Sequence, residues 1–241
     1  MLRNGVALNN SEFFAFCIFS VLEKSVELCY NNAKPFRKGA DTCFMSKKLI
    51  LVAAPPASGK TYASELLAKS IENSVYLDKD DLADLLHAAF RVSGNEVDMD
   101  GGFYIDNLRD AEYSTILNIA FSALRFSQTV ILNAPFGKEV RSSDYMKSLK
   151  ERANALGARL ILVWVKASRD TCYERMKKRN SPRDRLKLEN FEQFVSKINF
   201  TPPTPLESEG AVDRLILFDA ENRMAEGSLK ETLELLDADF S

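Results

Sequence analysis

The feature that most constrains this chain is an uninterrupted apolar run, Leu49 to Ala54, which leads directly into a short turn and an amphipathic helix. Such a run is typical of a strand buried on both faces of a parallel sheet. The turn, residues 55–61, reads PPASGKT. The pattern of a phosphate-binding loop is G-x-x-x-x-G-K-[ST] between a strand and a helix. Here Ala54 stands in place of the first glycine, and Gly59 is the second.

This loop predicts a site for ATP and Mg²⁺. Gly59 permits a tight turn that aims backbone N–H groups at phosphates, and the helix that follows adds the positive end of its dipole. Lys60 is expected to bind the β- and γ-phosphate oxygens, and the Thr61 hydroxyl to bind Mg²⁺. The alternative is an ordinary strand–turn–helix, which leaves residues 55–58 unexplained. The predicted nucleotide-binding residues of the loop are Pro56, Ala57, Ser58, Gly59, Lys60, Thr61 and Tyr62.

Strands and helices alternate along the rest of the chain, which predicts an α/β fold with a parallel sheet covered by helices on both faces. The apolar runs place five strands at residues 49–54, 75–77, 129–134, 159–165 and 215–218. Helical spacing and turn signals place helices at residues 61–71, 80–90, 105–126, 138–156, 168–179, 188–198 and 226–238.

The chain divides near residue 46. Residues 1–46 are expected to form an N-terminal helical extension and linker, and residues 47–241 the core domain. Met45 lies just before the first core strand, so the core could begin there. The first 44 residues are then either a docked extension or a product of the choice of translation start. The apolar run Phe13 to Leu22 is too short to span a bilayer, which needs about 20 apolar residues, and it lacks the flanks of a signal peptide.

The composition indicates which classes of partner the chain is not expected to bind. The formal net charge of −2 gives no overall attraction to nucleic acid or to an anionic membrane. The four cysteines show no metal-ligand spacing and are interpreted as free thiols in a reducing compartment. A cytoplasmic protein without a membrane partner is therefore expected.

Four blocks of sequence, in order, resemble the small P-loop kinases. They are LILVAAPPASGKT, VYLDKDD, VILNAPF and ERMKKRNSPRD. The similarity covers roughly residues 47–240. The nearest group is the zeta-toxin, polynucleotide-kinase and gluconate-kinase-like ATP-binding proteins, often labelled AAA-family ATPases. This resemblance implies a P-loop NTPase fold with its sheet in the order 2-3-1-4-5, a mobile lid, and phosphoryl transfer from ATP to a hydroxyl.

In such kinases an aspartate just after the second strand contacts the acceptor hydroxyl and serves as its base. The resemblance assigns this role to Asp80, with Asp78 as the rival and as a weaker candidate metal ligand. A carboxylate at the carboxyl edge of a strand faces the crevice where ligands bind. The alternative is that these aspartates only cap the next helix. Polynucleotide kinases carry an arginine three residues later, where this chain has Ala83.

Two further positions bear on the predicted activity. Relatives often carry an aspartate where Asn133 stands, and asparagine can still coordinate Mg²⁺ but brings no charge. In the lid, Arg175, Arg179 and Arg183 would close over ATP by resemblance, because the arginine fork suits phosphate oxygens. The alternative is a solvated basic face, paired with the nearby acidic residues Glu174, Asp184 and Glu189.

The sequence therefore predicts an ATP- and Mg²⁺-dependent kinase for a hydroxyl of a small molecule, a sugar or nucleotide derivative. The expected catalytic residues are Lys60, Asp80, Arg175 and Arg179. Arg109 is a candidate for contact with the acceptor, and the loop of residues 219–222 for contact with adenine. The alternatives are a nucleic-acid-end kinase, a nucleotide-binding regulatory ATPase with little transfer activity, and a toxin-like kinase with an antitoxin-like protein partner.

Overall fold

The structure is a computed structural model that describes residues 47–181, 184–221 and 224–237. The expected N-terminal extension, the start at Met45 and the lid residue Arg183 lie outside the described residues. The chain divides into two compact units, and residues 84–106 are the described part of the smaller one. The larger unit holds the sheet, the phosphate-binding loop and the residues of the candidate site.

The larger unit is built on a five-stranded parallel sheet in the order β2-β3-β1-β4-β5, as predicted. The central strand β1 is fully buried from Leu49 to Ala53, because it has a neighbouring strand on each side and helices on both faces. The strands are β1 (Lys47–Ala53), β2 (Ser74–Asp78), β3 (Thr129–Asn133), β4 (Ala158–Lys166) and β5 (Arg214–Asp219).

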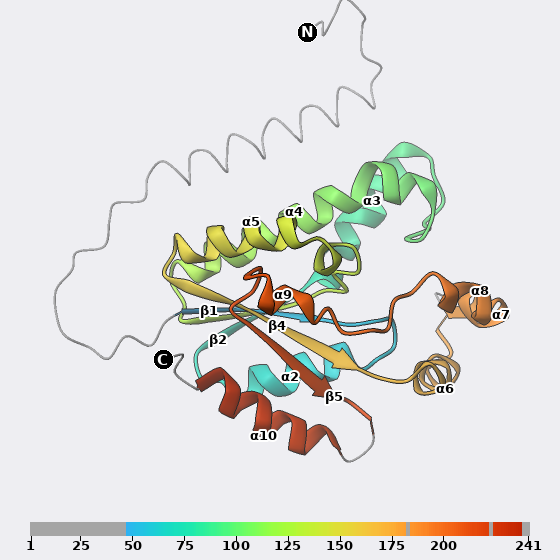
Figure 1. Ribbon diagram of the computed structural model, residues 1–241. Coiled ribbons are helices and arrows are strands. Elements are labelled where there is room, and N and C mark those ends of the chain that lie inside the picture. Colours follow the sequence, from blue (N-terminus) through green and yellow to red (C-terminus); the bar gives the residue numbers. More distant parts are fainter. Residues whose placement is uncertain (1–46, 182–183, 222–223, 238–241) are drawn as a thin grey trace, which may run out of the picture. The chain divides into compact units, whose positions relative to one another are not determined.

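Helices cover both faces of this sheet (Figure 1). Helices α4 (Arg109–Leu124) and α5 (Ser143–Asn154) pack on one face, and α2 (Lys60–Ser70) and α10 (Met224–Asp237) on the other. Because side chains alternate along a strand, Leu49 and Leu51 of β1 enter the first core and the intervening Ile50 enters the second. The same alternation decides on which face of the sheet each side chain at the carboxyl end of a strand lies.

Several predicted helices are interrupted where the structure changes pitch. The helix expected at 80–90 begins as a 3-10 turn, Lys79–Leu82, before α3 (Ala83–Ser93). The one expected at 105–126 begins as a π-helical turn, Tyr104–Leu108, before α4. Before α5, which was expected to begin at 138, lies a 3-10 turn, Glu139–Arg141, and the Ser142 side chain caps α5 at the Tyr145 N–H.

The lid region differs most from the prediction. Helix α6 (Arg169–Arg179) begins one residue later than expected and ends where expected. The helix expected at 188–198 is two short helices, α7 (Arg185–Glu189) and α8 (Phe191–Ser196). Helix α9 (Pro205–Ser208) was not predicted, because the prolines around it were interpreted as a loop. Proline is favourable in the first turn of a helix, where its missing N–H is no loss.

The predictions of free thiols and of no membrane-spanning helix can be compared with the described part of the chain. Cys172 is a free thiol buried on α6, and burial raises the pKa of this thiol to about 11. The other cysteines lie outside the described residues. In the described residues, no helix has both the length and the apolar character needed to cross a membrane.

Candidate active site

The phosphate-binding loop joins β1 to α2 and places Gly59 in the left-handed backbone conformation that favours glycine. Gly59 has a φ of 96° and lies at the N-terminus of α2. A Cβ atom there would also lie 3.1 Å from Arg175 Nη1 and 3.2 Å from Ala220 Cβ. Ala54 is buried, and it is not among the non-glycine residues with positive φ, whereas Ala57 is, with a φ of 60°. The alanine in place of the first glycine is therefore compatible with the loop.

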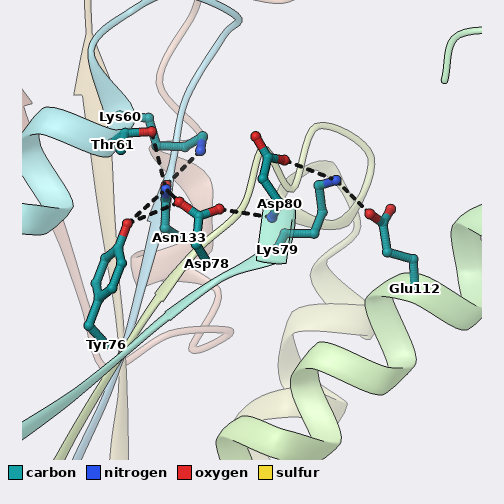
Figure 2. Close-up of polar contacts among 8 residues, drawn as sticks. All are labelled: Lys60, Thr61, Tyr76, Asp78, Lys79, Asp80, Glu112 and Asn133. Carbon is teal, nitrogen blue, oxygen red and sulfur yellow. Dashed lines mark hydrogen bonds and ion pairs between the residues drawn. The ribbon is translucent and has the colours of Figure 1, made fainter. Parts of the chain in front are cut away.

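Asn133 joins the loop to the carboxyl ends of β2 and β3. Its Oδ1 accepts a hydrogen bond from Lys60 Nζ (2.6 Å), and its Nδ2 donates to the Asp78 carboxylate and to Thr61 Oγ1 (3.3 Å). Figure 2 shows Asn133 between these groups, with the Tyr76 hydroxyl beside them. Asn133 pairs with Val52 of β1 on one side and with Asp78 of β2 on the other. The sheet order therefore creates this cluster.

The surroundings of Asn133 explain why an amide suits this position better than a carboxylate. It is fully buried, and it accepts from an ammonium on one side while donating to a carboxylate on the other. An aspartate at this position would place its carboxylate against that of Asp78, and two carboxylates in contact resist being charged together. The carboxylate that contacts Asn133 is therefore that of Asp78 on β2.

Tyr76 stabilises the Asp78 carboxylate. Its hydroxyl donates a hydrogen bond of 3.0 Å to Asp78 Oδ2. Burial raises the pKa of Tyr76, so the phenol keeps the proton that it donates. The other carboxylate oxygen of Asp78 accepts from the backbone N–H of Asp80 at 2.9 Å and so caps the 3-10 turn. Asp78 is thus both a capping residue and a member of the cluster at the loop.

Asp80 follows Asp78 by two residues, and Figure 2 shows one of its carboxylate oxygens directed toward Lys79. Its side chain is 63% exposed, and one carboxylate oxygen lies 3.5 Å from Lys79 Nζ. Lys79 in turn pairs with Glu112 of α4 at 2.7 Å. The two aspartates therefore occupy distinct surroundings, one beside Lys60 and Thr61 and one beside a buried ion pair.

Arg109, the candidate for contact with the acceptor, forms an ion pair with Glu139 at 2.8 Å. Both side chains are largely buried, at 13% and 7% exposure. The guanidinium also stacks on the Tyr113 ring, 4.4 Å from its centroid. Recruiting Arg109 to an acceptor would therefore require breaking a buried ion pair.

The structure separates the two predicted lid arginines that it describes. Arg175 Nη1 donates to Ser58 O at 2.6 Å, and its Nη2 donates to Ala220 O. It thus connects the phosphate-binding loop to the loop after β5. Arg179 instead forms a two-pronged pair with the buried Asp184, at 2.7 and 2.8 Å. This pairing of Arg179 is the alternative that the sequence left open.

Replacing Arg175 with alanine is expected to lower the free energy of unfolding by about 1–3 kcal/mol, because two backbone carbonyls lose their charged partner. ATP affinity is expected to fall with it, since the loop loses its connection to Ala220. Thermal unfolding and ATP titration measure the two effects. Arg185→Ala is the control, because Arg185 is an exposed lid arginine in a surface pair with Glu189. Unchanged stability and affinity in Arg175→Ala would contradict a bridging role.

Replacing Asn133 with aspartate is expected to lower the free energy of unfolding by about 1–3 kcal/mol without metal, through repulsion from Asp78. Added Mg²⁺ is expected to restore most of this loss. Melting temperatures with and without Mg²⁺ measure it. The double variant Asp78→Asn/Asn133→Asp has one carboxylate again and should regain stability without the metal. Equal melting temperatures for Asn133→Asp with and without Mg²⁺ would count against the assignment of the charge.

The donors present fit a Mg²⁺ ion held chiefly by nucleotide phosphates. Among the described residues, no group of three or more His, Cys, Asp or Glu side chains could hold a metal alone. The Thr61 hydroxyl and the Asp78 carboxylate are oxygen donors that share the partner Asn133. Mg²⁺ commonly takes one or two protein oxygens and completes its shell with phosphates and water.

Comparison with known proteins finds one matching family model, described as AAA domain, over residues 49–201. A candidate kinase from Chloroflexus aurantiacus J-10-fl is similar in structure, with a TM-score of 0.56 and 20% identity, over 78% of this chain and 98% of that one. A chain of the PezAT chromosomal toxin-antitoxin system of Streptococcus pneumoniae has a TM-score of 0.51 and 14% identity, over 98% and 91%. No curated protein matches significantly.

Proposed function

The chain belongs to the AAA domain family, and from this membership and the P-loop fold we propose that it transfers the γ-phosphoryl group of ATP to a hydroxyl of a small molecule. The observation that carries the proposal is the convergence of Lys60, Asn133 and Asp78 at the carboxyl ends of adjacent strands. Asp80 follows Asp78 by two residues. Phosphoryl transfer depends on positioning and charge stabilisation, and these groups supply both.

Lys60 is the cation for the transferred phosphoryl group. Its ammonium follows Gly59 at the start of α2, where the helix N-terminus also favours anions. The 2.6 Å hydrogen bond to Asn133 Oδ1 holds the ammonium at the loop through a neutral oxygen. A carboxylate in that place would neutralise it. Asn133 therefore orients Lys60 without competing for the phosphates.

Thr61 and Asp78 are the residues that would hold Mg²⁺. When bound there, the ion would neutralise charge on the phosphates and orient them. Asp78 contributes the anionic oxygen, and Tyr76 and Asn133 fix its direction by donating to it. The Thr61 hydroxyl accepts from the Asn133 amide and keeps its own proton and lone pair for a partner.

Asp80 is the group that receives the acceptor. The acceptor oxygen forms a bond to the γ-phosphorus as the bond from that phosphorus to the bridging oxygen breaks and ADP leaves. The proton of the acceptor hydroxyl passes to the Asp80 carboxylate. This residue suits the role because its side chain is 63% exposed and lies just past Asp78, next to the loop cluster.

Charge favours a small molecule over a nucleic-acid end as the acceptor. Both Lys79 and Arg109 are already paired with buried carboxylates, so neither adds a positive surface for a polyanion. In the larger unit, residues 79–83 and 107–112 include two basic residues, Lys79 and Arg109. Their four acidic residues are Asp80, Asp81, Asp110 and Glu112.

The proposal is tested by measuring ADP formation with Mg²⁺ and ATP against sugars, nucleosides, nucleotide sugars and 5′-hydroxyl oligonucleotides. An increase in ADP formation with one of the small molecules is the expected result. Stimulation by oligonucleotides alone would favour a nucleic-acid-end kinase. ATP binding without any stimulation by an acceptor would favour a regulatory ATPase instead.

A further inference from the structure

A buried ion pair lies directly beside Asp80. Lys79 Nζ and Glu112 Oε1 are 2.7 Å apart, and the two side chains are only 10% and 1% exposed. Glu112 belongs to the face of α4 that packs on the sheet, among apolar neighbours such as Tyr113 and Ile116. A buried ion pair is weak evidence for stability, because desolvation of both charges opposes their attraction. Packing alone therefore does not account for these two residues.

The geometry shows what the pair can do. The Lys79 ammonium lies between two carboxylates, 2.7 Å from Glu112 and 3.5 Å from Asp80 (Figure 2). The Tyr113 ring, 6.0 Å from the same nitrogen, forms one wall around it. Glu112 thus fixes the ammonium from the buried side, and the ammonium presents its charge to Asp80 on the exposed side.

Asp80 is the residue that needs such support. It lies on a short 3-10 turn, and its side chain is 63% exposed. An exposed aspartate side chain ordinarily samples several rotamers, whereas a group that receives a hydroxyl must stay within a fraction of an ångström of its working position. The neighbouring Asp78 is held by side chains in the same way, by Tyr76 and Asn133.

We propose that Lys79 and Glu112 are positioning residues for Asp80, with Glu112 anchoring the ammonium that holds the Asp80 carboxylate toward the acceptor. This inference rests on the proposed function of Asp80 as the group that receives the acceptor hydroxyl. Neither Lys79 nor Glu112 contacts the reacting atoms in this scheme. Both act through Asp80 alone.

The kinetic test is a double-mutant cycle with Lys79→Met, Asp80→Asn and the double variant. Lys79→Met is expected to lower kcat by roughly 10- to 100-fold and to leave ATP affinity within about twofold. In the Asp80→Asn background the same change should lower kcat by less than about twofold, because its target is already gone. An equal loss of kcat in both backgrounds would overturn the proposal.

A charge swap separates positioning from stability. Lys79→Met and Glu112→Gln should each lower the melting temperature by several degrees, since each removes the nearest opposite charge from a buried charged group. The swapped variant Lys79→Glu/Glu112→Lys restores an ion pair but places a carboxylate beside Asp80. It should regain melting temperature relative to the single variants without regaining kcat. Recovery of kcat together with stability would show that the pair is only structural.

Lys150→Met is the matched control. Lys150 pairs with Asp213 at 2.8 Å, and both side chains are 21% exposed. Asp213 lies at the amino-terminal end of β4 and β5, away from the strand ends that carry the site. This variant should lower the melting temperature and leave kcat unchanged. A loss of kcat as large as that of Lys79→Met would mean that any lost lysine pair lowers activity.

A second readout needs no turnover. Crystal structures of the wild-type protein and of Lys79→Met should show the Asp80 carboxylate displaced or spread over several rotamers in the variant. An Asp80 carboxylate that keeps its place without the ammonium would overturn the positioning role. Absence of acceptor-dependent turnover in the wild type would instead contradict the proposed function, so the two failures are distinguishable.

Discussion

Replacing Lys60 with alanine is expected to lower kcat for phosphoryl transfer by about a thousandfold, because the transition state loses the cation nearest its developing charge. The fold should survive. Lys60 lies at the end of the sheet, and its hydrogen bond to Asn133 can be replaced by water. ATP affinity is expected to fall as well, since the ammonium also contacts phosphates in the ground state. Steady-state kinetics and ATP titration measure both effects.

Lys69→Ala is the control for this variant. Lys69 lies in the last turn of the same helix, with its side chain 73% exposed in a surface pair with Glu65. Because exposed pairs of this kind contribute little, the control should behave as the wild type does. Equal activity of Lys60→Ala and the wild type would contradict the assignment of residues 54–61 as the phosphate-binding loop.

Replacing Asp80 with asparagine is expected to lower kcat by about 100- to 1,000-fold while leaving ATP affinity nearly unchanged. The amide keeps the size of the side chain but can no longer accept the hydroxyl proton. The hydrogen bonds that join Lys60 and Thr61 to Asn133 do not involve the Asp80 carboxylate, so the nucleotide side should be intact (Figure 2). Measurements of kcat, of the KM for the acceptor and of ATP affinity separate these effects.

Asp78→Asn is the informative comparison, because it removes a carboxylate of the same kind two residues away. Its expected signature is different: the Mg²⁺ concentration needed for half-maximal activity should rise, since Asp78 carries the charge next to Thr61 and Asn133. If Asp80→Asn instead raised the Mg²⁺ requirement and Asp78→Asn lowered only kcat, the two roles would have to be exchanged.

The strands could be predicted from sequence because burial dictates their composition. Leu49 to Ala53 is apolar without interruption since β1 is covered on both faces and on both edges. Burial does not reveal in the sequence where a helix changes from 3-10 or π-helical to α-helical pitch. Lys79–Leu82 and Tyr104–Leu108 have helical spacing, so the 3-10 and π-helical turns were interpreted as parts of the following helices. The short α9 was missed because proline was taken only as a sign of a loop.

The candidate site was predictable where a motif carries it, and less so where partners come from distant strands. Lys60 and Thr61 follow from the loop. Asn133 was interpreted as a departure that puts metal affinity in doubt, and the structure shows its amide hydrogen-bonded to the Asp78 carboxylate across the β2–β3 pair. The pairing of Asp78 with Asn133 depends on the order of strands in the sheet, which cannot be derived from the spacing of nearby residues. Arg175 and Arg179 share a helix face, but only Arg175 contacts the loop.

Lys79 and Glu112 were missed, although one of them left a signal in the sequence. Glu112 falls on the buried face of α4, together with Ile116 and Ala120. A charged residue on an apolar helix face is unusual unless it is paired. Spacing along α4 could have marked Glu112 for that reason, but its partner follows β2, 33 residues earlier.

The most direct test of the proposed function follows the phosphoryl group itself. The protein is incubated with Mg²⁺, ATP labelled at the γ-phosphate, and the acceptor that most stimulates ADP formation, and the label is then located. We expect the label in the phosphorylated acceptor for the wild type, and its absence there for Lys60→Ala. Label found only in inorganic phosphate would contradict a phosphotransferase and would mean that the protein hydrolyses ATP.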